Sequence, residues 1–331
     1  MKNLFIISTP SHYFNLLECI EEFNFKTNDS DILFLNSNSH TSNEMISNFI
    51  DKYVVASDWN NLIRIELWDT KNSSLFSTKN FKIIIQFVLK IFSNFLFKSY
   101  ENVTTSQIDQ FYFRFINTII FSKNIIALDE GNAIFKILEN RKKSSALNLL
   151  NNITFFTSYD VKIDQNSKDK IIKCNYSYSK RIIKKCNVNN NELFFIGSPY
   201  LEDNLVEEKI YWDYMYAIRD YYSNFHVTYF SHRRESEKNL TKIRNKFNFS
   251  CKTLDLPIEL YFLKIESMPE IISGFSSAAI FNLRKMTIES PIKFDAHCID
   301  FNSIKNSHSD KLELVFEDYK KNNINIINLL D

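Results

Sequence analysis

Three short polar motifs each follow an apolar, strand-like run of this chain, and each contains side chains that can do chemistry. They comprise Asp129, Glu130 and Gly131, then Ser231, His232, Arg233 and Arg234, and finally Ser276 and Ser277. Ligands of open α/β sheets bind at the carboxyl ends of the strands. The motifs therefore predict a site built from strand ends, with carboxylates, an imidazole and hydroxyl groups as its chemical parts.

The acidic pair of the first motif is Asp129 and Glu130. A carboxylate directly after a strand can act as general base on a hydroxyl nucleophile, and a neighbouring like charge helps to raise one of the two pKa values. In the alternative interpretation, Asp129 caps the following helix and Glu130 stabilises the helix dipole from the first turn. The pair alone leaves both interpretations open.

The second motif places a histidine, His232, beside two arginines, Arg233 and Arg234. This combination suits a phosphate, or a leaving group that gains negative charge. The alternative is a basic helix start on the surface, although helix starts prefer acidic residues. We expect one arginine to face the site and the other to pair with an acidic neighbour such as Glu235.

Two further segments start helices with groups that can bind a nucleotide. Ser276 and Ser277 precede an Ala-Ala-Ile-Phe helix, where hydroxyls and free backbone N–H groups form an anion site; the alternative is an ordinary serine N-cap. Glu259 lies in the first turn of a helix that starts near Pro257. That position favours dipole compensation, with hydrogen bonding to ribose hydroxyls as the alternative.

The chain has three glycines, Gly131, Gly197 and Gly274, in 331 residues, whereas average usage is about 7%. Glycine normally serves turns that need a positive φ, and here asparagine has often replaced it. The three remaining glycines therefore predict places where the backbone comes close to another group. The alternative is that an AT-rich genome removed glycines and three turns kept theirs by chance.

Strand-like and helix-like runs alternate, which predicts an α/β fold with parallel sheets. The expected strands are 4–8, 32–35, 125–128, 153–157, 193–196, 226–230, 251–254 and 271–273, and the expected helices include 13–22, capped by Ser11, and 207–224. The polar segment 159–192 is the predicted linker. We expect two Rossmann-like, doubly wound domains, 1–180 and 181–331, that face each other across a central cleft in a GT-B-like arrangement.

Composition excludes several classes of function. The net charge of +1 gives no global attraction to nucleic acid. Five scattered cysteines without a Cys-x-x-Cys motif indicate neither a zinc site nor a disulfide framework, and they fit a reducing cytoplasm. Three glycines are too few for a P-loop or a Gly-x-Gly-x-x-Gly motif. No metal or bound cofactor is therefore indicated.

The most hydrophobic segment, 81–97, is shorter than the roughly 20 apolar residues of a membrane-spanning helix. Lys82, Gln86 and Lys90 lie four residues apart, on one face of an amphipathic helix. We expect this helix to pack in a core or a dimer contact; the alternative is that it lies on a membrane. The basic segment 179–185 is expected to be a solvated linker face, with peripheral membrane contact as the alternative.

The order of these motifs resembles that of bacterial sialyltransferases: two acidic residues and a glycine, then a histidine at a strand end, then a Ser-Ser pair. The chain looks most similar to glycosyltransferase family 52, the lipooligosaccharide sialyltransferase group. Ser-Thr-Pro-Ser-His at 8–12 and Ile-Gly-Ser-Pro-Tyr-Leu-Glu at 196–202 support a resemblance over nearly the full length. The family implies a GT-B fold, CMP-sialic acid as donor, inversion at the anomeric carbon and no metal requirement.

By this resemblance, Glu130 is the base that deprotonates the acceptor hydroxyl, beside Asp129. His232 matches the histidine of the family's His-Pro motif, which contacts the CMP phosphate and is a candidate general acid. Arg233 stands where the family has proline, and we expect it to contact phosphate instead. The other expected site residues are Ser276 and Ser277 for phosphate, Glu259 for ribose, Gly197 and Gly274 in the donor site, and His12 and Asn15 in the cleft.

The expected function is therefore transfer of sialic acid, with α-2,3 as the expected linkage, to a galactose-terminated, lipid-linked glycan of the bacterial surface. Two alternatives are transfer of another CMP-nonulosonic acid or nucleotide sugar, and a non-catalytic glycan-binding role. The resemblance also implies a homodimer. The expected location is the cytoplasm, and access to a lipid-linked acceptor would need peripheral membrane contact. An Asp-x-Asp pair, Asp29 and Asp31, holds a divalent metal in some glycosyltransferases, but its polar context predicts a solvated turn here.

Overall fold

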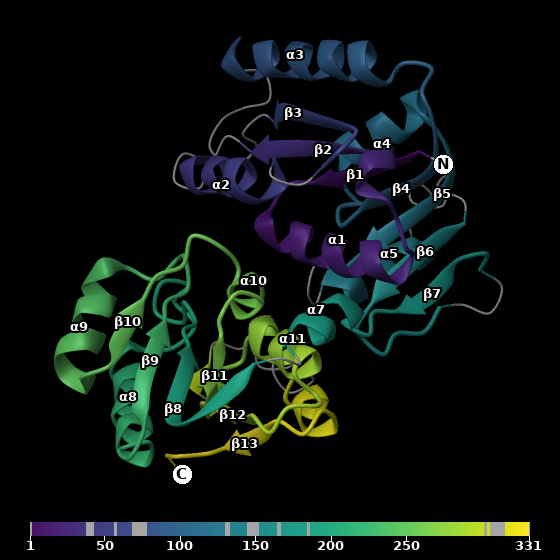
Figure 1. Ribbon diagram of the computed structural model, residues 1–331. Coiled ribbons are helices and arrows are strands. Elements are labelled where there is room, and N and C mark those ends of the chain that lie inside the picture. Colours follow the sequence, from purple (N-terminus) through teal and green to yellow (C-terminus); the bar gives the residue numbers. More distant parts are fainter. Residues whose placement is uncertain are drawn as a thin grey trace. The chain divides into compact units, whose positions relative to one another are not determined.

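The apolar runs of the sequence form the strands of two separate sheets in which every strand pair is parallel (Figure 1). Such strands are buried on both faces and read as continuous hydrophobic runs. A computed structural model describes residues 2–37, 43–55, 58–67, 78–129, 133–143, 152–163, 167–183, 186–300, 303–304 and 315–330. The chain divides into unit 1, Met1–Tyr178, and unit 2, Ser179–Asp331.

Unit 1 contains a seven-stranded sheet of order β3-β2-β1-β4-β5-β6-β7. Its strands are β1 Asn3–Ile7, β2 Ser30–Ser37, β3 Asn61–Leu67, β4 Ser99–Thr105, β5 Phe121–Leu128, β6 Ile153–Thr157 and β7 Lys170–Lys173. Its helices are α1 Pro10–Glu22, α2 Asn43–Phe49, α3 Thr78–Phe95, α4 Phe111–Ile119 and α5 Ala133–Lys143, with a 3-10 turn at Thr27–Asp29 and a π-helical turn at Ile50–Val54. Helix α7, Ser177–Ile183, crosses the boundary into unit 2.

Unit 2 contains a six-stranded sheet of order β10-β9-β8-β11-β12-β13. Its strands are β8 Asn187–Ile196, β9 His226–Phe230, β10 Ser250–Lys252, β11 Ser267–Gly274, β12 Lys293–His297 and β13 Asn325–Ile327. Its helices are α8 Glu208–Tyr221, α9 Glu237–Phe247, α10 Ile258–Phe262 and α11 Ala278–Met286.

Both sheets are doubly wound. In each, the chain starts at a central strand, runs to one edge and then returns to build the other half, so the order reverses between β1 and β4 and between β8 and β11. A switch point of this kind opens a crevice at the carboxyl ends of the two strands, where ligands bind in this class of sheet. The predicted fold class, two Rossmann-like units of the GT-B type, is confirmed.

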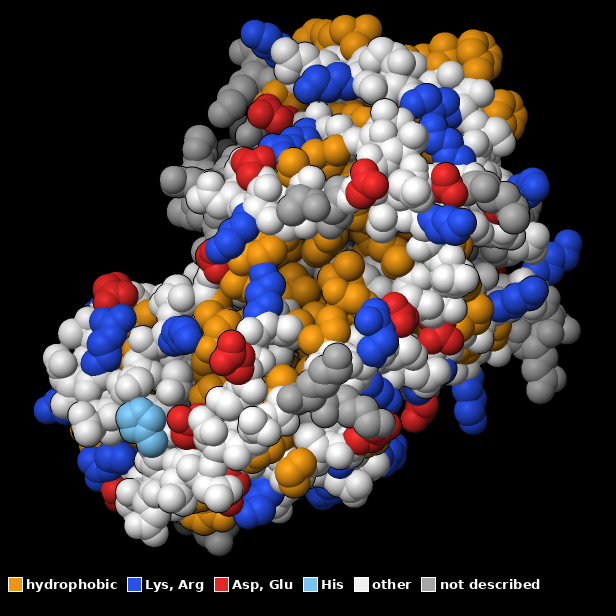
Figure 2. Space-filling model, viewed as in Figure 1, with side chains coloured by type: hydrophobic (Ala, Val, Ile, Leu, Met, Phe, Trp, Pro, Cys, Tyr) orange, Lys and Arg blue, Asp and Glu red, His pale blue; other side chains and the backbone are white. Residues whose placement is uncertain are grey.

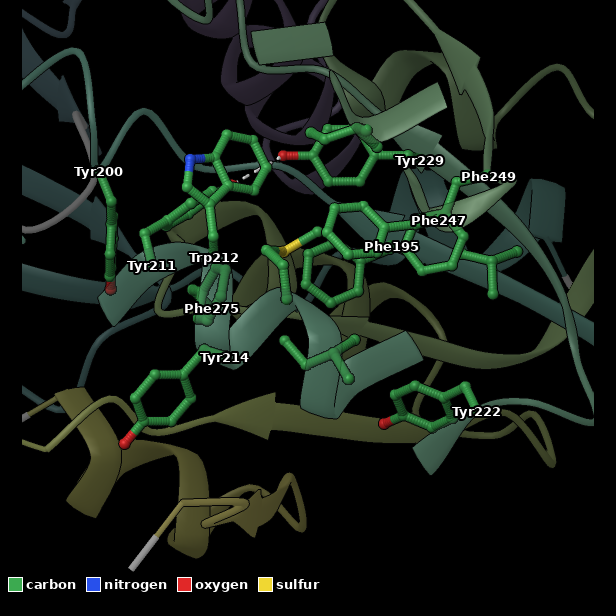
Figure 3. Packing of buried hydrophobic residues seen from close by; sticks show 14 of the residues in the cluster. Phe195, Tyr200, Tyr211, Trp212, Tyr214, Tyr222, Tyr229, Phe247, Phe249 and Phe275 are labelled. Atoms are coloured by element: carbon green, nitrogen blue, oxygen red, sulfur yellow. Dashed lines mark hydrogen bonds between the residues drawn. The ribbon is translucent and has the colours of Figure 1, made fainter. Parts of the chain in front are cut away.

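Aromatic rings dominate the core of unit 2 (Figure 3). Phe195 of β8 and Tyr229 of β9 stack with their ring centroids 5.5 Å apart, and Phe275, after β11, meets Phe195 edge-on at 5.7 Å. Tyr211 and Trp212 of α8 belong to the same buried cluster. Large rigid rings near the strand ends thus fix three adjacent strands and one helix to each other.

Three parts of the prediction are wrong. Segment 159–192 is not a linker, because it contains β7, all of α7 and the first half of β8. Strand β7 is an edge strand of sequence KIIK, and lysines on such an edge hide the strand pattern while they discourage pairing with other chains. Helix α1 is capped by Thr9, whose hydroxyl accepts a hydrogen bond from the N–H of His12 at 3.3 Å, and not by Ser11. Strands β3 and β4 were missed because polar residues interrupt them.

Asparagine occupies most of the left-handed backbone positions. Six of the eight described non-glycine residues with positive φ are asparagines: Asn24, Asn152, Asn191, Asn204, Asn248 and Asn323. Asparagine tolerates this region because its short polar side chain can hydrogen-bond locally. Gly197 and Gly274 do not have such a φ, but an added Cβ would lie 2.8 Å from Phe230 O and 2.6 Å from Ile196 O, respectively. The prediction of close backbone approach is therefore confirmed for these two, whereas Gly131 lies outside the described residues.

Helix α3 is amphipathic, as predicted. Lys82, Gln86 and Lys90 are exposed on one face, whereas Ile83 and Phe87 are buried on another. Within the part of the chain that is described, no helix has the length and apolar character needed to cross a membrane.

Replacing Gly197 by alanine should destabilise the protein by about 1 to 3 kcal/mol, the range typical of overpacking. The new methyl group would lie 2.8 Å from Phe230 O and from the Tyr229 hydroxyl, and it would also meet the Glu235 carboxylate. Chemical denaturation measures the change. Ser223→Ala, at an exposed position of the same unit, is the control and should shift stability by less than about 0.5 kcal/mol. Equal stability of the two variants would contradict the close approach.

Candidate functional site

Three adjacent strands of unit 2 carry predicted site residues at their carboxyl ends. Gly197 directly follows β8, His232 lies just after β9, and Ser276 lies just after β11. Strand β8 lies between β9 and β11, and the switch point of the sheet falls between β8 and β11. The fold therefore brings these residues to one edge of the sheet, at the place where doubly wound sheets bind ligands.

A carboxyl group that the sequence analysis did not assign to the site, Glu235, lies beside Gly197. Its Oε1 accepts a hydrogen bond from the Tyr229 hydroxyl at 2.5 Å, and its Oε2 accepts one from the N–H of His232 at 2.6 Å. Burial raises the pKa of Glu235 to about 7, against the opposing effect of these two donors, and the Glu202 carboxylate adds to the rise. Glu235 therefore titrates near neutral pH while it holds the backbone of His232.

The loops after β8 and β9 are joined by a second carboxylate, Glu202. Its Oε1 accepts hydrogen bonds from the N–H of Ser236 at 2.7 Å and from Nδ2 of Asn239 at 2.8 Å. Ser236 is the N-cap of α9. The segment that starts at Gly197 thus anchors the helix that follows the His232 motif.

The two arginines of the motif have different environments. Arg234 forms an ion pair with Asp203 at 2.6 Å, so the expected acidic partner is present, but it is not Glu235. The reason is that Glu235 turns inward beside Gly197, while Asp203 reaches Arg234 from the neighbouring loop. Arg233 is exposed, and within the described residues no hydrogen bond or ion pair to it is found. Its positive charge is therefore available to an anion.

His232 is held as a neutral hydrogen-bond donor. Its Nδ1 accepts a hydrogen bond from the N–H of Arg234 at 3.2 Å, which assigns the proton of the neutral ring to Nε2. Burial lowers the pKa of His232 to about 4, and the charges of Arg234 and Arg233 add to this effect. The imidazole is therefore uncharged near neutral pH. Service as a general acid requires a bound anion, whose negative charge would raise this pKa.

The two serines after β11 serve different purposes. Ser276 Oγ shares a hydrogen bond of 2.6 Å with the Tyr200 hydroxyl, a contact that spans the switch point between β8 and β11. Ser277 is the N-cap of α11, because its hydroxyl accepts from the N–H of Ala279 at 3.2 Å. Its own N–H donates to the Tyr319 hydroxyl at 2.7 Å. Ser277 therefore has the capping role given above as the alternative, and Ser276 lies at the strand-end site.

Glu259 is buried rather than exposed at a helix start. Its Oε1 accepts a hydrogen bond from Nδ2 of Asn282 at 2.8 Å, which links α10 to α11. Burial raises the pKa of Glu259, with the Asn282 bond opposing the rise. Glu259 therefore joins two helices of unit 2, and its contact with ribose hydroxyls stays a prediction.

The switch point of unit 1 is also spanned by polar contacts. Ser8, at the end of β1, donates a hydrogen bond from its hydroxyl to Oε1 of Gln107, which follows β4, at 3.0 Å. The N–H of Ser8 donates to Nδ1 of His12 at 3.3 Å. His12 is therefore part of this strand-end cluster, and its role in the cleft stays a prediction. Gln107 was missed because β4 was missed.

Asp129, at the end of β5, is a buried carboxyl with one oxygen bonded and the other not. Its Oδ2 accepts from the N–H of Ser158 at 2.7 Å, and its backbone carbonyl accepts from Nδ2 of Asn15 at 2.7 Å. Oδ1 is buried without a hydrogen bond from any described residue. Burial raises the pKa of Asp129 to about 6, against the opposing effect of Thr157 and Ser158. Glu130 lies outside the described residues.

The prediction that Asp29 and Asp31 lie in a solvated turn is wrong for Asp31. This residue belongs to β2 and is fully buried. Burial alone would raise the pKa of Asp31, but hydrogen bonds from Asn61, Tyr100 and Asn60 outweigh it and hold the pKa below its ordinary value. Asp31 is therefore a structural carboxylate. Among the described residues, no group of three His, Cys, Asp or Glu side chains is placed to hold a metal ion.

The imidazole of His232 should titrate near pH 4 instead of near its ordinary 6.5. Nitrogen-detected NMR measures this value and the tautomer, which should carry its proton on Nε2. Arg234→Met should raise the pKa, because it removes a positive charge beside the ring. Arg219→Met removes an arginine paired with Asp220 and should leave the titration unchanged. An ordinary pKa in the folded wild type would disprove the assigned environment.

Asp129→Asn should change how stability depends on pH. The folded-state pKa of Asp129, about 6, lies above its ordinary 3.8, so the folded state favours the protonated carboxyl. Its contribution is fully present below about pH 4 and is lost as the pH rises through about 6, at a cost on the order of 2 to 3 kcal/mol. The variant cannot ionise and should lose less stability over this window.

Chemical denaturation below about pH 4 and above about pH 7 measures this difference. The asparagine oxygen can keep the bond from Ser158, so the fold should survive. Asp220→Asn, at an exposed position, is the matched control and should follow the wild type. Parallel stability curves for the wild type and Asp129→Asn would show that Asp129 titrates normally.

No protein-family model and no curated protein matches the chain. The fold is similar to that of UDP-GlcNAc 2-epimerase from Methanocaldococcus jannaschii, solved with UDP-GlcNAc and UDP, with a TM-score of 0.51 and 13% identity over 96% of this chain and 92% of that one. MurG from Acinetobacter baumannii has a TM-score of 0.45 and 8% identity, with 99% and 86% covered. The E. coli heptosyltransferase WaaC, solved with ADP, has the same values, with 98% and 99% covered. At such low identity the epimerase comparison shows a shared fold and no more.

Proposed function

We propose that this protein is a glycosyltransferase that uses a nucleotide-activated sugar, with CMP-sialic acid as the donor. The observation that carries the proposal is the placement of His232, Arg233 and Ser276 at the carboxyl ends of adjacent strands, around the switch point of unit 2. A neutral N–H donor, a guanidinium and a hydroxyl are suitable partners for a phosphate group. The motif resemblance to family 52 selects sialic acid among the sugars.

In the proposed reaction, unit 2 stabilises the departing nucleotide. As CMP leaves, negative charge grows on its phosphate, and donors already fixed in place lower the barrier without reorganising. Glu235 and Arg234 hold His232 through its backbone N–H and its Nδ1, so that Nε2–H is free to donate to the phosphate. Arg233 adds a full positive charge. Protein donors of this kind can stabilise the leaving group without a metal ion.

In the proposed reaction, unit 1 activates the acceptor hydroxyl. We assign Glu130 as the base that takes the proton while the sugar oxygen attacks an oxocarbenium-like centre, which inverts the anomeric carbon. Asp129 precedes it and is fixed at Oδ2 by Ser158. Its unpaired Oδ1 and raised pKa make it the alternative base, and separate variants distinguish the two roles. The acceptor proposed is a galactose-terminated surface glycan.

The fold gives further support for a nucleotide sugar as the ligand class. The M. jannaschii epimerase, which has this fold, was solved with UDP-GlcNAc and UDP. None of the described contacts reads the base or the sugar, so a different CMP-nonulosonic acid or nucleotide sugar would use the same strand ends. A panel of donors must therefore be part of the test.

The deciding experiment is release of CMP from CMP-sialic acid in EDTA, with and without a galactose-terminated acceptor. We expect acceptor-dependent release that falls at least about a hundredfold in Glu130→Gln, the loss typical of removing a general base. Arg233→Met should weaken CMP binding at least about tenfold, because it removes a charge-assisted contact to phosphate. Glu66→Gln, at an exposed position, and Arg219→Met, at a half-buried one, are the matched controls and should behave like the wild type.

Each other outcome has a defined meaning. Full activity of Glu130→Gln together with loss in Asp129→Asn would move the base role to Asp129. CMP binding without release would keep the nucleotide site and point to another CMP-sugar. Absence of both binding and release, in a folded protein, would reject the sialyltransferase proposal.

A further inference from the structure

Helix α3 exposes a continuous apolar stripe on its outer face. Phe81, Ile85, Leu89, Phe92 and Leu96 recur at intervals of four, four, three and four residues, which places them on one side of the helix. All five are exposed, Leu89 at 63%. Figure 2 shows hydrophobic side chains gathered along its upper edge, where Figure 1 places α3. We refer to these five residues as the α3 stripe.

The α3 stripe is not needed to hold the helix on its unit. A different face of α3 carries Ile83, Phe87, Ile91 and Phe95, which are all buried, and the helix packs against β3 and α4. Helix α3 therefore has two apolar faces, of which only one packs in the core. Exposed contiguous apolar patches of this kind mark interaction sites.

The apolar surface extends beyond the end of the helix. Phe97, the next exposed residue, is 82% exposed in a left-handed conformation with φ 63°. Phe121, at the start of β5, is 67% exposed and donates its backbone N–H to Lys98 O at 3.2 Å. The backbone of Phe121 thus lies beside that of Lys98, the residue after Phe97, so both exposed phenylalanines belong to the C-terminal end of the α3 stripe.

The charge beside the α3 stripe is positive. Lys82 and Lys90 are exposed on the polar face of the helix, where Lys82 adjoins the stripe and Lys90 donates from Nζ to Arg64 O at 3.5 Å. Residues 70–100 contain five lysines and no aspartate or glutamate, whereas the whole chain is nearly neutral, with a net charge of +1. The surface therefore combines apolar side chains with local positive charge that the segment itself does not neutralise.

We propose that α3 lies flat on an anionic lipid surface, with the α3 stripe in the boundary between headgroups and acyl chains. Lys82, at the border of the α3 stripe, can extend to the headgroups, and anionic lipids supply the negative charge that this segment lacks. A second copy of the helix would instead bring more lysines and no carboxylate. The lipid surface is thus the occupant that matches both the apolar stripe and its charge.

Vesicle co-sedimentation of the full chain tests this proposal without any sugar donor, so its result is independent of the proposed enzymatic function. The wild type should bind phosphatidylcholine vesicles that contain phosphatidylglycerol, and should bind pure phosphatidylcholine much more weakly. Phe81→Ser with Leu89→Ser should lower the binding at least about tenfold, because two exposed apolar anchors are lost. Lys82→Gln with Lys90→Gln should lower binding only to the anionic vesicles.

The matched control is Val55→Ser with Ile288→Ser, which removes two apolar side chains, each 49% exposed, away from α3. It should bind like the wild type. Wild-type protein that ignores anionic vesicles would overturn the proposal, as would unchanged binding of the Phe81→Ser, Leu89→Ser variant. Light scattering measures the oligomeric state in addition. If the wild type is a dimer that does not bind vesicles, and Phe81→Ser with Leu89→Ser makes it a monomer, the α3 stripe binds a second copy of the chain instead.

Discussion

The site of unit 2 depends on the absence of side chains at two strand ends. A Cβ added to Gly274 would lie 2.6 Å from the carbonyl oxygen of Ile196, the last residue of β8. A Cβ added to Gly197 would come equally close to the end of β9, at 2.8 Å from Phe230 O. The central strand of the sheet is thus tightly flanked on both sides. The space beside Gly197 is what admits the Glu235 carboxylate, and Glu235 in turn fixes the backbone of His232.

Because of that packing, neighbouring charged groups have two different roles, either to hold the loops or to bind a ligand. Carboxylates hold the loops: Glu202 binds the start of α9, and Asp203 pairs with Arg234. The groups that remain for a ligand are then a neutral imidazole and Arg233, an arginine without an ion-pair partner among the described residues. Because burial and nearby cations keep the imidazole uncharged, the resting site attracts an anion through Arg233 and completes its hydrogen bonding through Nε2–H of His232.

The sequence predicted the parts of this arrangement that depend on local pattern. The apolar run 226–230 marks a buried strand and therefore locates His232 at a carboxyl end. The role of Glu235 was missed because the space beside Gly197 forms only when β8 packs against the end of β9, which a local sequence pattern does not reveal. Asp31 was expected to be solvated because its main partners, such as Tyr100, are distant along the chain. Strand β4 and the polar residue at its end, Gln107, were missed for a simpler reason, since SYENVTT lacks an apolar run.

The exchange of glycine for asparagine in left-handed turns also affects the unfolded chain. Glycine has the most backbone freedom to lose on folding, so a residue with a side chain at a compatible turn lowers that loss by about 0.4 to 1 kcal/mol. The left-handed conformation itself costs a residue with a Cβ roughly 1 to 2 kcal/mol. These opposing terms are similar in size, so a turn such as Asn248 changes net stability little. Asparagine cannot replace Gly197 or Gly274 in this way, because its Cβ would collide with a neighbouring backbone oxygen whatever the dihedral angle.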